Sequence, residues 1–84
     1  MKRRHQKTLN AIFAHPISGN IPWREIEALF VELGAEISER EGSRVAVVLF
    51  NEVKVFHRPH PHPNTDKGAV ASIRRWLEQH GVIP

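Results

Sequence analysis

Three histidines and an arginine share a short proline-rich segment, His57-Arg58-Pro59-His60-Pro61-His62-Pro63. Each proline lacks a backbone N–H and holds the residue before it in an extended or polyproline conformation, so the segment cannot be helical. Imidazole has an unperturbed pKa of about 6.5 and can take up or release a proton near neutral pH. The segment is therefore predicted to be stiff and exposed, with side chains suited to a site that binds or processes phosphate groups or RNA.

Other chemistries fit the chain less well. His60 and His62, two residues apart on extended backbone, could chelate a metal ion, but no third ligand lies at an obvious spacing. The sequence contains no phosphate-binding glycine loop, nucleophile elbow or carboxylate dyad, and Asp66 is better explained as a helix cap. We therefore expect no metal and no cofactor.

Length and composition indicate one small domain. The chain has 84 residues, of which 40% are hydrophobic, and this is enough for a single core. The absence of cysteine excludes disulfides and thiolate metal sites and is typical of a reducing compartment. No apolar run approaches the roughly 20 residues that span a bilayer, and no apolar stretch follows the basic N-terminus as in a signal peptide. We expect a cytoplasmic protein that does not contact membranes.

Charge is distributed unevenly along the chain, whose net charge is +3. Residues 1–20 carry four basic and no acidic side chains, whereas residues 21–42 carry six glutamates against two arginines. If the fold brings the basic flanks together, one face is positive and attracts nucleic-acid phosphates. The segment Lys2-Arg3-Arg4 can equally be a solvated tail. The basic side chains predicted to bind RNA are Lys54, Arg58, Lys67, Arg74 and Arg75.

Hydrophobic periodicity predicts six elements in the order α-α-β-β-β-α. Helices are expected at 7–14, 22–33 and 67–80, and strands at 35–40, 44–50 and 53–58. This order predicts an α+β fold, with a three-stranded antiparallel sheet and the last two helices on one of its faces. The domain spans residues 1–84, of which 1–20 form a basic extension with a short helix and 21–84 form the core. Trp23 and Trp76 lie on helical apolar stripes and are expected inside.

The hairpin formed by the second and third strands is apolar on both faces. A two-residue loop at Asn51-Glu52 pairs Phe50 with Val53 and puts Arg44 and His57 on one face, one step apart along the sheet edge. Because the two main helices cover only one face, the other needs a cover. The N-terminal helix, a second copy of the chain or a protein partner could provide it.

From Ile26 to Val82, about two-thirds of the chain, the sequence resembles the HicA toxins of bacterial toxin–antitoxin pairs. The resemblance rests on the order of an amphipathic helix, a strand, a hairpin and a final helix, together with short motifs. These motifs are Leu33-Gly34, Gly42-Ser43, Pro59-His60-Pro61, Lys67-Gly68 and Gly81-Val82. The resemblance implies a fold like that of double-stranded-RNA-binding domains, ribosome-independent cleavage of mRNA, and neutralisation by a HicB-type antitoxin.

The chain departs from the family pattern at one position. In the family, Gly-Ser is followed by the histidine taken as catalytic, whereas here Gly42-Ser43 is followed by Arg44. Arginine cannot act as a general base near neutral pH, because its pKa exceeds about 12, but it can bind a phosphate with two N–H groups. Cleavage without a metal would then need His57 or His60 as base, another histidine of the segment, such as His62, as acid, and Arg44 or Arg58 on the phosphate.

Two further interpretations remain open. The family-type catalytic residue is absent, so the chain could be a catalytically inactive module that binds RNA or protein on the same fold. If instead the apolar sheet face self-associates and the basic residues scatter, the chain would be a structural homodimer without a role in RNA chemistry. Convergence of Arg44 with the histidines would favour the nuclease.

Overall fold

The computed structural model describes residues 1–84 and confirms the predicted order of elements. The helices are α1 (Arg3–Ile12), α2 (Trp23–Glu32) and α3 (Lys67–Gln79), and the strands are β1 (Glu36–Arg40), β2 (Arg44–Leu49) and β3 (Glu52–His57). The three strands form one antiparallel sheet in the order β1-β2-β3. The fold is therefore α+β, as predicted. None of the helices combines the length and apolar character that crossing a membrane requires.

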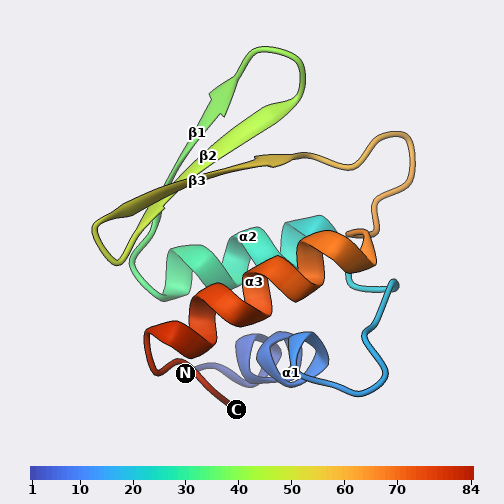
Figure 1. Ribbon diagram of the computed structural model, residues 1–84, viewed down its shortest axis with the longest axis vertical. Coiled ribbons are helices and arrows are strands. Elements are labelled where there is room, and N and C mark those ends of the chain that lie inside the picture. Colours follow the sequence, from blue (N-terminus) through green and yellow to red (C-terminus); the bar gives the residue numbers. More distant parts are fainter.

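The molecule has three layers (Figure 1). Helices α2 and α3 lie on one face of the sheet and contact each other through Phe30 and Trp76, and α1 packs beneath them, on the side away from the sheet. One continuous core joins the layers, and its largest fully buried side chains include Trp76, Phe30, Leu9 and Ile12. The prediction that both main helices cover the same face of the sheet is confirmed.

Helix α1 begins four residues earlier than predicted and ends two residues earlier. Its predicted bounds, 7–14, are wrong because the basic residues at the N-terminus are part of the helix and not a solvated tail. The backbone N–H groups of His5 and Gln6 donate to the Lys2 carbonyl, and His5, Thr8 and Leu9 form with Ile12 a buried stripe at helical spacing. The stripe packs on α2 and α3, so α1 covers the helices and leaves the outer face of the sheet open.

Local signals set the ends of the other two helices. The Asp66 carboxylate accepts a hydrogen bond of 3.1 Å from the Ala69 N–H and caps the start of α3. Gly34 and Gly81 follow the ends of α2 and α3 with φ of +101° and +75°, where a residue without Cβ is favoured. These ends lie where the sequence predicted them, to within one residue.

The turn of the β2–β3 hairpin differs from the prediction by one residue. Leu49 pairs with Glu52, so the loop is Phe50-Asn51, and both loop residues have positive φ, 58° and 60°. Phenylalanine is unusual at such a φ, but its ring packs edge-on against Trp76 at 5.6 Å and stacks on His80 at 4.2 Å. Glu52, now in the strand, accepts a 2.6 Å hydrogen bond from the Trp76 indole N–H.

The faces of the hairpin are those predicted, because the corrected pairing moves β3 by two residues and side chains alternate with a period of two. Val45, Val47 and Phe56 enter the core. Val53 and Val55 are 61% and 54% exposed on the outer face. No element of this chain covers that face.

Arg74 fastens α1 to α3. Its guanidinium donates to the carbonyl of Ile12 at 3.2 Å and to that of Ala14 at 3.0 Å, and lies 6.0 Å from the Phe13 ring centroid. The Ile12 carbonyl is in the last turn of α1 and that of Ala14 lies just beyond it, so neither has a partner within the helix. The cation therefore acts as a C-terminal cap supplied by another helix.

Replacing Arg74 by alanine should lower the free energy of unfolding by about 1–2 kcal/mol, because two hydrogen bonds to backbone carbonyls are lost. Urea denaturation followed by circular dichroism measures the change. Arg75→Ala, an exposed arginine on the same helix, is the matched control and should change stability by less than about 0.5 kcal/mol. Equal effects of the two substitutions would contradict this role for Arg74.

The Glu52 carboxylate should make stability pH-dependent. The hydrogen bond from Trp76 and the nearby His80 and Lys54 lower the pKa of Glu52 below its ordinary value of 4.5. The charged form is thus favoured in the folded state, and its stabilisation is present above pH 4.5 and lost as the pH falls through the folded pKa. Chemical denaturation at several pH values measures the free energy of unfolding. The difference in this free energy between the unmodified protein and Glu52→Gln should shrink below pH 4.5. A pH-independent difference would refute the assignment.

Candidate active site

A row of basic side chains crosses the outer face of the sheet at one end. Arg44 in the central strand pairs with Arg40 of β1 on one side and with His57 of β3 on the other. Paired residues point to the same face, so the three side chains stand next to one another. Arg40 and Arg44 meet because the three-residue turn Glu41-Gly42-Ser43 connects their strands, with Gly42 and Ser43 at φ of +69° and +64°.

Arg44 and His57 are direct neighbours, which is closer than the predicted offset of one step. The Arg58 N–H donates to the Ser43 carbonyl at 2.8 Å, so Ser43 and Arg58 are the hydrogen-bonded pair. The next pair, Arg44 and His57, is then of the non-hydrogen-bonded type, in which opposite side chains come closest. The Arg44 Nε donates to the Glu41 carbonyl at 2.9 Å, which leaves its terminal N–H groups available to an anion.

Beyond His57 the chain forms a shallow hollow of about 370 Å³. It is lined by His57, Arg58, Pro59, His60, His62, Asn64 and Asp66, without any hydrophobic side chain. The three histidines are exposed, and the peptide bond between His60 and Pro61 is cis. The structure therefore brings the histidines of the proline-rich segment around one hollow, and His57 belongs both to this hollow and to the basic row.

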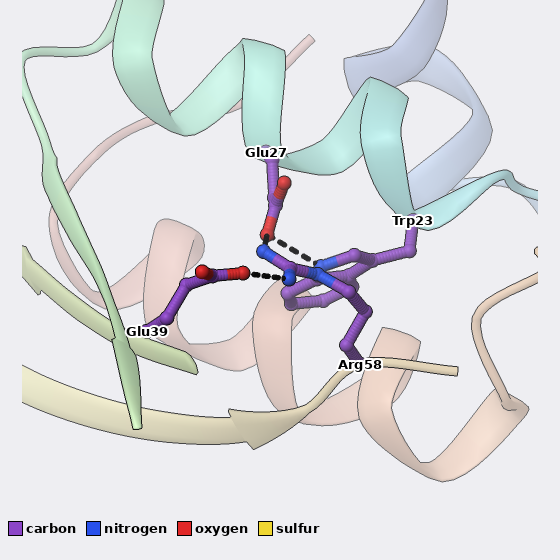
Figure 2. Close-up of polar contacts among 4 residues, drawn as sticks. All are labelled: Trp23, Glu27, Glu39 and Arg58. Atoms are coloured by element: carbon purple, nitrogen blue, oxygen red, sulfur yellow. Dashed lines mark hydrogen bonds and ion pairs between the residues drawn. The ribbon is translucent and has the colours of Figure 1, made fainter. Parts of the chain in front are cut away.

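Arg58 lines the hollow, but its charge is already matched (Figure 2). Its guanidinium forms ion pairs with Glu27 of α2, at 3.0 Å, and with Glu39 of β1. Glu27 also accepts a 2.7 Å hydrogen bond from the Trp23 indole N–H. The hydrogen bonds with Glu39 and Glu27 raise the pKa of Arg58, which stays charged. Arg58 thus ties the end of β3 to α2 and β1, and little of its charge is free for RNA.

The other basic residues predicted to bind RNA lie apart from the hollow. The ammonium group of Lys54 is 5.8 Å from the Trp76 ring centroid, on the helix side of the sheet. Lys67 opens α3 beside Asp66, and its methylene groups pass close to Gly19. Arg74 holds α1, and Arg75 is exposed on α3. Of the predicted cations, only Arg44 has unpaired charge next to a histidine of the site.

Two residues of this region were not predicted. Arg40 belongs to the basic row, and Asn64 lines the hollow beside the histidines. Arg40 could have been predicted from the sequence, because it and Arg44 flank a glycine-containing turn. Asn64 could not, because its position depends on a bridge to Pro22 at the start of α2. No group of three or more potential metal ligands is assembled.

The two ion pairs of Arg58 should differ in strength. The Glu27 side chain is 22% exposed and that of Glu39 is 75% exposed, so water and salt screen the second pair more. Double-mutant cycles with Arg58→Gln, Glu27→Gln and Glu39→Gln should give a coupling of about 1 kcal/mol with Glu27 and below about 0.5 kcal/mol with Glu39. Urea denaturation supplies the free energies. A larger coupling with Glu39 would contradict this ranking.

Comparison with known proteins identifies the family. The family model described as HicA toxin of bacterial toxin-antitoxin matches residues 23–82, from the first residue of α2 to just beyond α3. Helix α1 lies outside the matched region. No curated protein and no solved structure matches the chain significantly. The match covers well over half of the 84 residues, and the chain belongs to the HicA family of toxins from bacterial toxin–antitoxin systems.

Proposed function

We propose that this toxin binds mRNA and cleaves it at the place where the basic row meets the histidine hollow. The observation that carries the proposal is the direct pairing of Arg44 with His57, which also lines the hollow with His60 and His62. A cation that can hold a phosphate thus stands beside a side chain that can move a proton. These are the two elements that cleavage of RNA without a metal requires.

In the proposed reaction, a neutral histidine takes the proton of the ribose 2′-hydroxyl. The 2′ oxygen then attacks the adjacent phosphorus, and the bond from phosphorus to the 5′ oxygen breaks. A protonated histidine gives its proton to the departing 5′ oxygen, so that the products are a 2′,3′-cyclic phosphate and a free 5′-hydroxyl. His57, next to Arg44, suits the role of base, and His60 or His62, which line the same hollow, suits the role of acid.

By the resemblance, Arg44 takes the position of the histidine that follows Gly-Ser in the family, and its proposed role is electrostatic. Its terminal N–H groups can donate to the phosphate oxygens, whose negative charge increases in the transition state. Arginine stays protonated at all relevant pH values, so it cannot replace a general base. The proton transfers of the proposed mechanism therefore fall to the histidines of the proline-rich segment.

The proposed partner is a HicB-type antitoxin, and the proposed location is the cytoplasm. The open outer face, with Val48, Val53 and Val55 beside the basic row, supports a contact with this partner or with a second copy of the chain. A catalytically inactive RNA- or protein-binding module is the second candidate function. It is favoured by arginine at the position that follows Gly42-Ser43.

Substituting the histidines tests the nuclease. His57→Ala should lower the cleavage rate of a single-stranded RNA by about 10²–10⁴-fold, the usual contribution of a general acid or base. The triple variant with His60→Ala and His62→Ala should be inactive in cleavage and in growth arrest. His15→Ala, an exposed histidine outside the hollow, is the matched control and should keep full activity. Circular dichroism should show all variants folded, since exposed substitutions cost less than about 0.5 kcal/mol.

Arg44→Ala should slow turnover without moving the pH optimum, because arginine does not titrate there. Full cleavage by the triple histidine variant would refute the proposed chemistry. No cleavage by the unmodified protein, freed from any antitoxin, would refute the nuclease and leave the binding module.

A further inference from the structure

A second basic hollow lies between α1 and α2. Its volume is about 440 Å³, and it is lined by Arg4, His5, Lys7, Thr8, Arg24, Glu25 and Ala28. The first four residues belong to α1, which the family match does not include, and the last three belong to α2. The hollow therefore exists only because the N-terminal helix packs against the family region.

The charges around this hollow do not balance. Arg4, Lys7 and Arg24 contribute three positive charges, and Glu25 contributes the only negative one. None of the three cations takes part in an ion pair, in contrast to Arg58 in the first hollow. Two of the positive charges are thus left without a counter-charge, and an anion in the hollow would relieve their mutual repulsion.

A buried imidazole forms part of the wall. His5 is only 4% exposed. Its Nε2 lies 3.8 Å from the Oε1 atom of Glu32 in α2, so the ring forms an ion pair between the two helices when it is protonated. His5 thus connects α1 to α2 beside the hollow.

The lining also indicates which part of a ligand fits. Ala28 is the only hydrophobic residue, and the lining contains no phenylalanine, tyrosine or tryptophan on which a base could stack. Two guanidinium groups and an ammonium group offer donors only. A group rich in acceptor oxygens and carrying negative charge, such as phosphate, matches this set.

The second hollow lies close to the candidate active site. The Trp23 N–H donates to the Pro63 carbonyl at 2.9 Å, and Pro22 forms a bridge with Asn64. The first turn of α2 is thus fixed to the loop that carries the histidines, and Arg24 is in this turn. Asn64 of the first hollow and Arg24 of the second are thus each one residue away from the hydrogen-bonded pair Pro63 and Trp23.

We propose that the hollow between α1 and α2 binds phosphate groups of the RNA backbone, next to the site of cleavage. That the phosphate groups belong to RNA rests on the proposed function, whereas the affinity of the hollow for phosphate does not. The N-terminal helix then has a role in substrate binding, because it supplies Arg4 and Lys7.

The RNA part is tested by fluorescence anisotropy of a labelled single-stranded RNA over a range of salt concentrations. Arg4→Gln, Lys7→Gln and Arg24→Gln should each weaken binding and reduce the slope of log K against log salt by about 0.7, the value for one phosphate contact on a single strand. Arg3→Gln is the matched control, since it removes the same charge from the same helix but does not line the hollow. It should leave the slope nearly unchanged.

The phosphate part is tested by titrating inorganic pyrophosphate into ¹⁵N-labelled protein. The amides of Lys7, Thr8 and Ala28 should shift in the unmodified chain and not in the variant that combines the three hollow substitutions. No shift in the unmodified chain would overturn the proposal.

The remaining outcomes separate this proposal from the proposed function. Shifts with pyrophosphate but RNA slopes equal to that of Arg3→Gln would identify a site for free phosphates and overturn the RNA part. Shifts with pyrophosphate in a protein that does not bind RNA would refute the proposed function while the phosphate site stands. Hollow substitutions that weaken only antitoxin binding would make the hollow a protein contact and overturn the proposal.

Discussion

The packing of four aromatic rings between the sheet and the two main helices supports the rest of the structure. Phe30 and Trp76 are 5.8 Å apart between ring centroids, and both contact Phe56 of β3, at 6.0 and 6.3 Å. Trp23 joins them at 5.5 Å from Phe56. These rings fix the position of β3 relative to α2 and α3, although β3 is an edge strand with most of its side chains exposed.

The two tryptophans also connect the buried core to polar side chains at the surface. Each indole N–H donates to a glutamate, from Trp23 to Glu27 and from Trp76 to Glu52. Glu27 in turn holds Arg58 at the end of β3, and Glu52 closes the turn at its beginning. Both ends of the edge strand are therefore fixed by a polar contact that starts from a buried ring.

This arrangement determines what the candidate site can be. Arg58 turns toward α2, and because side chains alternate along a strand, its neighbour His57 faces outward beside Arg44. Arg58 thus has a structural role, and Arg44 remains available to an anion. The basic residues of the helices differ in the same way: Arg74 caps α1, whereas Arg4, Lys7 and Arg24 form no ion pair.

The sequence by itself determined the elements and the two faces of the sheet. The apolar stripes of α2 and α3, the glycines that end them and the alternation along the strands are local signals that act over a few residues. The faces of the hairpin were predicted correctly although the turn was not, because the β2–β3 pairing differs from the prediction by two residues, an even number. The sequence also determined that three histidines lie together, because they fall within a stretch of six residues that prolines keep extended.

Only the tertiary structure decided which charges are free. Arg58 meets Glu39 and Glu27, 19 and 31 residues away, and Arg74 meets Ile12 and Ala14, 62 and 60 residues away, so no local pattern shows that these cations are already used. The turn at Phe50 was likewise set by Trp76 and His80, whose contacts outweigh the poor fit of phenylalanine to a positive φ. Electrostatic and aromatic contacts depend on distance in space, and that distance is known only when the chain has folded.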